Sequence, residues 1–181
     1  ITEHGVEFTC IDGKEPVGIC GSGILAVLKE LIRTGLVRKN GAFVKKENIP
    51  EEDYRYPMIR MNGKKREFLI CEAPELVVTQ GDIRQVQLAK GAILSGFLAL
   101  LNKAGISMEE LDKVMIAGQF GAHLPAESLT GTGILPKEVE DKIIYVGNSS
   151  KTGAYMTLLS EQVKEEMEGL AERMEYIELA E

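Results

Sequence analysis

The chain has 181 residues and a net charge of −7, and no stretch of it is apolar for long enough to span a bilayer. The acidic balance argues against nucleic acid as a partner, because a face that binds phosphate backbones needs a basic excess. The N-terminal sequence ITEHGVEF lacks the basic start and apolar run of a signal peptide. We therefore expect one sizeable domain, or a compact lobe of a larger protein, that is cytoplasmic and has neither nucleic acid nor a membrane as partner.

The residues that most often hold metals are sparse in this sequence. Cys10, Cys20 and Cys71 are far apart, and no Cys-x-x-Cys pattern occurs. This spacing does not make an iron–sulfur or zinc site, so reduced, mostly buried thiols are expected. His4 and His123 cannot form a metal site without carboxylates. We assign no catalytic residue and no metal ligand.

The N-terminal third predicts a hairpin followed by a helix. Val6–Ile11 and Val17–Cys20 are short β-type runs separated by a turn. After Gly21-Ser22-Gly23, apolar residues recur at helical spacing. Ser22 is predicted to cap this helix, and Gly35 to be the left-handed residue just past its end.

The middle of the chain predicts an insertion and then a long helix. Residues 37–76 contain short apolar runs, turn residues and a basic cluster, which indicates an inserted excursion of small strands and loops. A helix is predicted from Asp82 to Ala104, with Thr79 and Asp82 as a capping box. Its small residues, among them Gly91, predict the close approach of another helix or of a bound group.

The last third alternates strands and helices. The predicted order is a strand at Lys113–Ala117, a short helix at Pro125–Thr130, a strand at Lys142–Val146 and a helix at Ser149–Met174. In parallel sheets, ligands bind beyond the carboxyl ends of the strands. Three turns are therefore candidate sites: Gly21-Ser22-Gly23, Gly118-Gln119-Phe120-Gly121 and Gly147-Asn148-Ser149-Ser150.

Familiar phosphate motifs do not explain these turns. VGNSSKTG lacks the glycines of a P-loop, whose places hold Tyr145 and Ser150. CGSGILA fits a dinucleotide fingerprint only weakly, because a basic, turn-like sequence follows where an acidic residue should bind ribose. Sharp connections without any ligand remain the alternative for each single turn, whereas three such turns at one sheet edge favour a ligand.

Five segments carry a family resemblance, and they occur in the same order in that family: GICGSGI, TQGDIRQVQLAKGAI, IAGQFGAHL, GTGILP and VGNSSKTGA. The chain resembles the C-terminal lobe of the reductive activators of corrinoid proteins, and most of all the activating enzymes of anaerobic O-demethylases. These proteins belong to the ASKHA superfamily of acetate and sugar kinases, heat-shock chaperone ATPases and actin. The resemblance covers essentially the whole chain and implies an α/β, ribonuclease-H-like lobe with a mixed sheet flanked by helices and an insertion at about 37–76.

The resemblance also implies a function. Such activators return an inactive Co(II) corrinoid protein of a methyltransferase system to Co(I), with ATP and with electrons from an iron–sulfur cluster. It implies nucleotide contacts at one group of residues, Gly118, Gln119, Phe120, Gly121, Gly147, Asn148 and Ser149. In this superfamily, nucleotide binds in a cleft between two lobes. The resemblance implies that a second group of residues lies at this cleft, where two helices cross: Gly21, Ser22, Gly23, Gln80, Asp82 and Arg84. A glutamine at position 119, where relatives often have glycine, either crowds the nucleotide or hydrogen-bonds to it.

Some parts of the implied machinery are not in this sequence. The superfamily's Asp-x-Gly-Thr loops, which hold Mg²⁺ and the phosphates, do not occur here, and neither does the iron–sulfur domain. The chain also lacks an initiator methionine. We therefore expect a lobe of a longer protein, inactive by itself, whose partners are the upstream lobe, the iron–sulfur domain and a corrinoid protein. The alternatives are a small-molecule kinase lobe of the same superfamily and a protein-docking lobe without nucleotide.

Overall fold

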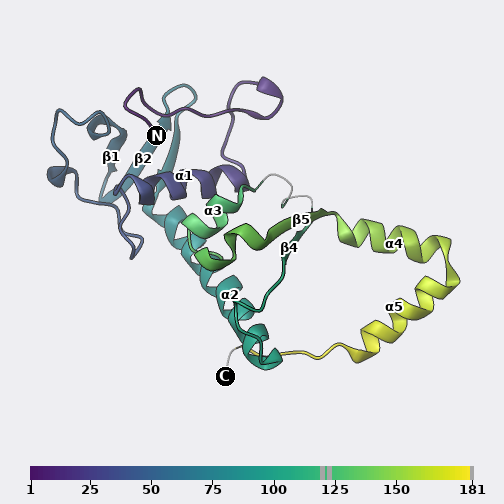
Figure 1. Cartoon of the computed structure of the whole chain (residues 1–181). Coiled ribbons are helices and arrows are strands. Elements are labelled where there is room, and N and C mark those ends of the chain that lie inside the picture. The colour runs from purple at the N-terminus through teal and green to yellow at the C-terminus, as the bar shows by residue number, and fades with distance from the viewer. Residues whose placement is uncertain (119–120, 122–123, 180–181) are drawn as a thin grey trace. The chain divides into compact units, whose positions relative to one another are not determined.

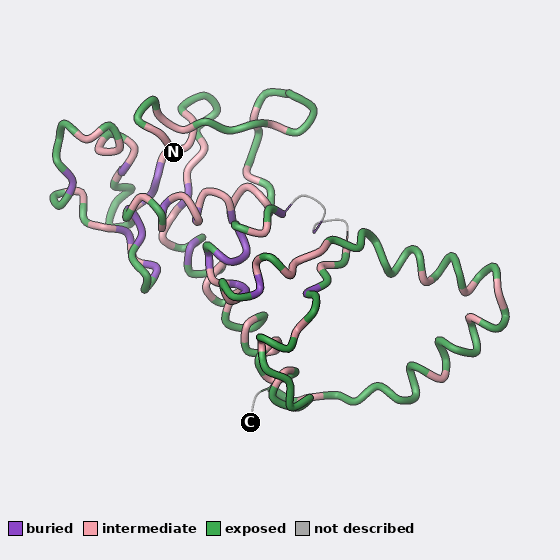
Figure 2. Tube along the Cα trace, viewed as in Figure 1, coloured by how far each residue is buried: buried purple, intermediate pink, exposed green. Residues whose placement is uncertain are grey.

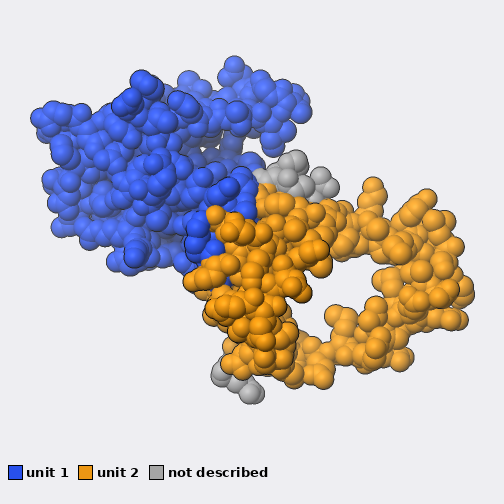
Figure 3. Space-filling view, in the orientation of Figure 1, with its two compact units in different colours: residues 1–93, 125–137 blue, residues 94–124, 138–181 orange. Residues whose placement is uncertain are grey.

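The computed structural model describes residues 1–118, 121 and 124–179. These residues form two compact units (Figure 3), one comprising residues 1–93 and 125–137, the other residues 94–124 and 138–181. Figure 1 labels most of the helices and strands of both. The expected mixture of strands and helices is present, but the strands form two small sheets rather than one.

The first unit combines an antiparallel sheet with helices. Its regular elements are α1 (Gly21–Arg33), β1 (Ile59–Asn62), β2 (Lys65–Cys71), β3 (Leu76–Thr79) and α3 (Ala126–Gly131), and α2 (Gln80–Ala104) begins in it. Short 3₁₀ turns occupy Ile11–Gly13, Lys46–Asn48 and Tyr56–Met58, and a fourth at Lys137–Lys142 leads into the second unit. The strand order is β1-β2-β3. β1 and β2 lie within the predicted insertion and β3 begins at its last residue, so this segment contains small strands, as expected.

The core of the first unit lies between this sheet and α1. Phe68 on β2 pairs with Ile59 on β1 and with Val78 on β3, and all three side chains are fully buried. Leu28 and Leu31 of α1 belong to the same apolar cluster. The buried segments of the tube in Figure 2 follow these elements. Burial of apolar area is the main stabilising contribution here, at about 25 cal/mol per Å².

The predicted helix signals of this unit are partly confirmed. Gly35 has φ +73 and follows α1, as the sequence predicted. Thr79 and Asp82 form the expected capping box, since the Asp82 carboxylate accepts from the Thr79 N–H at 2.8 Å and the Thr79 hydroxyl accepts from the Asp82 N–H at 3.2 Å. Ser22 does not cap α1, because it lies inside the first turn and the N-cap is Cys20.

The predicted N-terminal hairpin is wrong. Among the described residues, neither Val6–Ile11 nor Val17–Cys20 forms a strand, although Asp12 and Gly13 do adopt the positive φ angles of a tight turn. Pro16 removes a backbone donor just before the second run, which weakens any ladder there. This segment instead lines an apolar cavity of about 480 Å³ in the first unit.

The second unit contains a parallel strand pair and two helices. Its strands are β4 (Val114–Ala117) and β5 (Ile143–Gly147), and its helices are α4 (Ser149–Leu159) and α5 (Glu161–Arg173). The parallel pairing of β4 with β5 confirms the strand–helix–strand interpretation. The single helix predicted over Ser149–Met174 is wrong, because Ser160 is extended and its hydroxyl caps α5 by accepting from the Val163 N–H at 3.3 Å.

The part of the chain that the structure describes holds no helix that is both long and apolar enough to cross a membrane.

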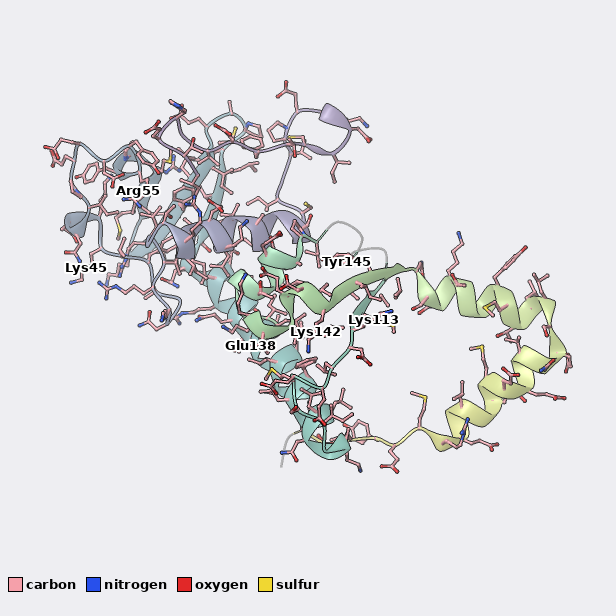
Figure 4. The ribbon with its side chains drawn as sticks, in the orientation of Figure 1. Lys45, Arg55, Lys113, Glu138, Lys142 and Tyr145 are labelled. Carbon is pink, nitrogen blue, oxygen red and sulfur yellow. The ribbon has the colours of Figure 1, made fainter. Side chains whose placement is uncertain are left out.

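An ion pair in the insertion makes stability depend on pH. The Asp53 carboxylate accepts from Arg55 Nε at 2.8 Å, and this hydrogen bond lowers the pKa of Asp53 to about 2, from an ordinary value of 3.8. Arg55, labelled in Figure 4, also donates to the carbonyl of Thr34 after α1. Because the folded pKa lies below the unfolded one, the stabilisation is complete above pH 3.8 and is lost as the pH falls toward 2.

We therefore expect the free energy of unfolding to decrease by about 1–2 kcal/mol from this ion pair over that pH window, with solvent screening included. Denaturant titrations at several pH values measure the effect. Asp53→Asn is the matched variant, since it should be less stable than the native chain above pH 4 and should lose this part of the pH dependence. If the free energy of unfolding depended on pH equally in both proteins, the pH dependence could not be assigned to Asp53.

Candidate functional site

The carboxyl ends of β4 and β5 bring two of the predicted glycine turns together. The N–H of Gly118 donates to the carbonyl of Gly147 at 2.8 Å, so the two glycines lie side by side where the strands end. Both have positive φ angles, +98 for Gly118 and +70 for Gly147, which side chains other than glycine adopt only with strain. Among the described residues, a Cβ added at either position would meet no atom within 4 Å. Glycine is therefore favoured at both positions by the backbone, and no described side chain crowds it.

The N–H of Gly118 is not available to a ligand, because the Gly147 carbonyl already accepts it. A ligand at this edge would instead contact the uncovered α-carbons of the two glycines. Their lack of side chains lets a flat group approach the backbone closely.

Gly121 serves packing rather than an open site. It is buried, and a Cβ added there would lie 2.7 Å from Cγ2 of Ile116 on β4. Its N–H donates to the carbonyl of Gly118 at 3.2 Å, which closes the turn. The predicted contacts Gln119 and Phe120 lie outside the described residues, as does His123.

The first turn of α4 follows directly from β5. Asn148 is its N-cap, and the Asn148 carboxamide oxygen accepts from the N–H of Lys151 at 3.0 Å. Ser149 and Ser150 occupy the first helical positions, whose N–H groups have no acceptor within a helix. Gly147, Asn148 and Ser149 are all exposed. This end of α4 offers polar donors and the positive end of a helix dipole, which suit an anionic or polar group.

Tyr145 is a residue that the sequence interpretation missed. It lies on β5 (Figure 4), and its hydroxyl donates to the backbone carbonyl of Leu124. This bond fixes the chain where it leaves the turn after Gly121. The sequence offers no signal for it, because the contact depends on how the segment after β4 folds back toward β5.

The turn Gly21-Ser22-Gly23 lies in the first unit and begins α1, but it does not follow a strand as predicted. The Cys20 thiol lies 3.2 Å from the Ser22 hydroxyl. Hydrogen bonding from Ser22, aided by the Gly23 backbone N–H, lowers the pKa of the Cys20 thiol from 9.0. This turn thus belongs to a different unit from Gly118 and Gly147, which the structure joins within the second unit.

The first turn of α2 contains the remaining predicted site residues. Gln80 is used structurally: its side chain accepts from the N–H of Phe43 at 3.0 Å and donates to the carbonyl of Gly41 at 2.7 Å. Asp82 closes the capping box, whereas Arg84 is exposed. Gln80 and Asp82 thus hold the helix start and the neighbouring loop in place.

The predicted crossing on the small-residue side of α2 is not found at Gly91. A Cβ added there would meet no atom within 4 Å. In the first unit, the residues of α2 that belong to or pack on the core containing α1 are Ile83 and Val86, near the helix start. The larger side chains bury more apolar area, so they form the contact.

The groups that the described residues offer at the ends of β4 and β5 are backbone and polar side-chain groups. No group of three or more His, Cys, Asp or Glu side chains comes close enough to hold a metal ion in the parts described. The ends of β4 and β5 carry glycine, asparagine and serine, but no described acid or base lies among the predicted contacts there. Such an edge can bind and orient a polar ring or a sugar without transferring protons itself.

The comparisons with known proteins agree on one family. The family model for the C-terminal domain of RACo, the ASKHA domain, matches residues 1–181. The corrinoid activation enzyme RamQ of Eubacterium limosum is 33% identical over an alignment of 172 residues, which covers 88% of this chain and 28% of that enzyme. The [Co(II) methylated amine-specific corrinoid protein] reductase of Methanosarcina barkeri is 28% identical over 138 residues, covering 76% of this chain and 21% of that protein.

A solved structure supports the same relationship. A reductive activator for corrinoid, iron–sulfur protein superimposes with a TM-score of 0.82 at 32% identity, over 96% of this chain and 28% of that one. The resemblance seen in the sequence and the α/β fold class are confirmed. The chain spans about a quarter of the length of the proteins that it matches.

Proposed function

The chain belongs to the family of the C-terminal ASKHA domain of RACo, and from this membership we propose that it is the nucleotide-binding lobe of an ATP-dependent reductive activator. The activator would return an inactive Co(II) corrinoid protein to Co(I). Two relatives support the proposal by their names, one a corrinoid activation enzyme and the other a Co(II) corrinoid protein reductase. The observation that carries it is the family match over residues 1–181.

The geometry at the ends of β4 and β5 supports nucleotide binding in particular. The purine and ribose would lie against the open side of Gly118 and Gly147, where side chains are absent. Asn148 and Ser149 would border the ribose and orient it through polar groups at the start of α4. Gly121 and Tyr145 would keep this edge rigid, because one packs on Ile116 and the other bonds the Leu124 carbonyl.

The phosphates and their Mg²⁺ require residues from another lobe. Mg²⁺ prefers carboxylate and other oxygen ligands, and the described residues provide no cluster of such side chains. Within this proposal, ATP supplies the free energy that makes the reduction of cobalt favourable, and this chain contributes binding and orientation. The lobe with the phosphate loops would belong to the same longer polypeptide.

The electron source also lies elsewhere in this proposal. An iron–sulfur cluster needs about four thiolate ligands held together. Cys10, Cys20 and Cys71 form no disulfide. Among the described residues, they belong to no group of side chains that could hold a metal ion. The residues present therefore do not fit a cluster, and the electron would reach the corrinoid from a separate iron–sulfur domain.

Hydrogen–deuterium exchange with and without Mg–ATP tests the proposal on the longer polypeptide that contains this chain. We expect slower exchange at residues 114–118 and 143–151 when ATP is bound, because these segments form the proposed contact. ATP binding without any change in these two segments would overturn the site. Absence of ATP binding, together with failure to promote Co(II) reduction, would overturn the function.

A second candidate is a lobe that docks on the corrinoid protein. The observation that favours it is the number of exposed apolar side chains on α4 and α5, among them Tyr155, Leu158 and Leu170. Exposed apolar patches commonly mark protein interfaces. Titration with a Co(II) corrinoid protein in the absence of ATP separates the two functions, because a docking lobe binds under this condition.

A further inference from the structure

The first unit contains a cavity of about 300 Å³ that none of the assigned functions uses. Five apolar side chains line part of it: Leu28, Ile32, Val37, Ile83 and Val86. These residues come from α1, from α2 and from the segment that follows α1. The volume lies at the lower end of the range for small-molecule sites, which suits a ligand about as large as a single ring.

Three cations also line this cavity. They are Arg38, Lys39 and Lys90. Within the described part of the chain, no acidic residue belongs to the lining. Among the described residues, none of the three cations forms a salt bridge, although the protein carries a net charge of −7. A cluster of like charges without counter-charges raises the electrostatic potential of a cavity and attracts anions.

Two glycines with positive φ angles leave space for polar side chains at the cavity. Gly133, at φ +75, is in contact with the Lys90 ammonium, and Gly41, at φ +77, is in contact with the Gln87 carboxamide. A Cβ at either glycine would overlap the polar end of its neighbour. The absence of a side chain at both glycines therefore leaves room at the cavity for these two polar ends.

The nearby hydroxyl of Thr132 is already used. It donates to the carbonyl of Ser128 at 2.7 Å, within α3 and its C-terminal cap. Recognition of a negative group therefore depends on the cations and on the Gln87 amide, all of which are hydrogen-bond donors. Gly131-Thr132-Gly133 begins the GTGILP segment, which the nucleotide site does not use.

We propose that this cavity binds a small organic anion with one carboxylate or phosphate group. Its apolar body would contact Leu28, Ile32 and Ile83, and its charged group would accept from Lys90 and Arg38. Charge-assisted hydrogen bonds of this kind are about twice as strong as neutral ones. The inference lies beyond the activator function and does not depend on it, because every lining residue belongs to the first unit.

The test compares four probes on the 181-residue chain by calorimetry: phenyl phosphate, phenylacetate, inorganic phosphate and phenol. We expect at least one aromatic anion to bind more tightly than inorganic phosphate, since the apolar lining adds affinity, and phenol to bind weakly. The two aromatic anions distinguish a phosphate from a carboxylate ligand. Raising NaCl from about 0.05 M to about 0.5 M should weaken binding, because Arg38 and Lys39 are exposed.

Variants locate the binding. Lys90→Met should lower the affinity about tenfold, the usual effect of losing one charge-assisted hydrogen bond. Arg38→Met is the second variant, at an exposed position where the fold is not at risk. Lys64→Met is the matched control, since Lys64 is an exposed cation in the β1–β2 turn, and it should leave the affinity unchanged.

Amide shifts in NMR spectra give an independent readout, and the largest changes are expected at Gly41, Gly131 and Gly133. Phenol binding as tightly as the anions would overturn the proposal. So would unchanged affinity in both Lys90→Met and Arg38→Met, or the absence of binding by both aromatic anions.

Discussion

Replacing Gly118 with valine is expected to lower the affinity for ATP at least tenfold in the polypeptide that holds this domain. The φ angle of +98 is unfavourable for a β-branched residue by about 1–2 kcal/mol, so the end of β4 would shift. The new side chain would also occupy the space beside the strand end, where a Cβ added at Gly118 would meet no atom of the described residues within 4 Å. Calorimetric titration with Mg–ATP measures the change, in which a tenfold loss corresponds to about 1.4 kcal/mol.

Gly105→Val is the matched control for this experiment. Gly105 also has a positive φ angle, +67, and a Cβ added there would likewise meet no atom within 4 Å. It lies just after α2 in the second unit, not at the end of a strand. The variant should show comparable backbone strain and retain ATP affinity. Equal losses in both variants would mean that strain, rather than contact at Gly118, explains the effect.

Replacing Phe68 with alanine is expected to reduce the free energy of unfolding of the first unit by about 3–5 kcal/mol. Phe68 is fully buried in the middle strand of the antiparallel sheet, opposite Ile59 and Val78. Its removal leaves a cavity between the sheet and α1 that these neighbours cannot fill completely. Denaturant unfolding, followed by circular dichroism, measures the loss.

The matched control is Met61→Ala. Met61 lies on β1 of the same sheet, where it is 55% exposed. Substitution there should change stability by no more than about 0.5 kcal/mol. A similar loss for both variants would show that the sheet is not organised around the Phe68 core.

The local features of this domain were largely predictable from its sequence. The capping box of Thr79 and Asp82 and the left-handed Gly35 depend on residues within a few positions of each other. The parallel arrangement of β4 and β5 followed from strand–helix–strand order. The family was recognisable from five motifs, and the match over residues 1–181 confirms it.

The candidate site was predictable in its residue types but not in its grouping. The sequence indicated three glycine turns at one sheet edge, and the structure joins two of them, Gly118 and Gly147, at the ends of β4 and β5. The turn at Gly21 does not follow a strand, since the preceding residues form no described strand and instead line a cavity. The resemblance implies a place in the cleft for Gln80, whereas its side chain holds the loop at Gly41 and Phe43.

The sequence by itself determined the class of fold, the family and the chemistry of the strand ends, because these depend on periodicity, caps and motifs that neighbouring residues encode. Only the tertiary structure decided which residues meet. The Gly118–Gly147 contact, the bond from Tyr145 to Leu124 and the cluster of cations around Lys90 all join segments far apart along the chain. Such contacts depend on how the segments pack in three dimensions, which no local pattern records.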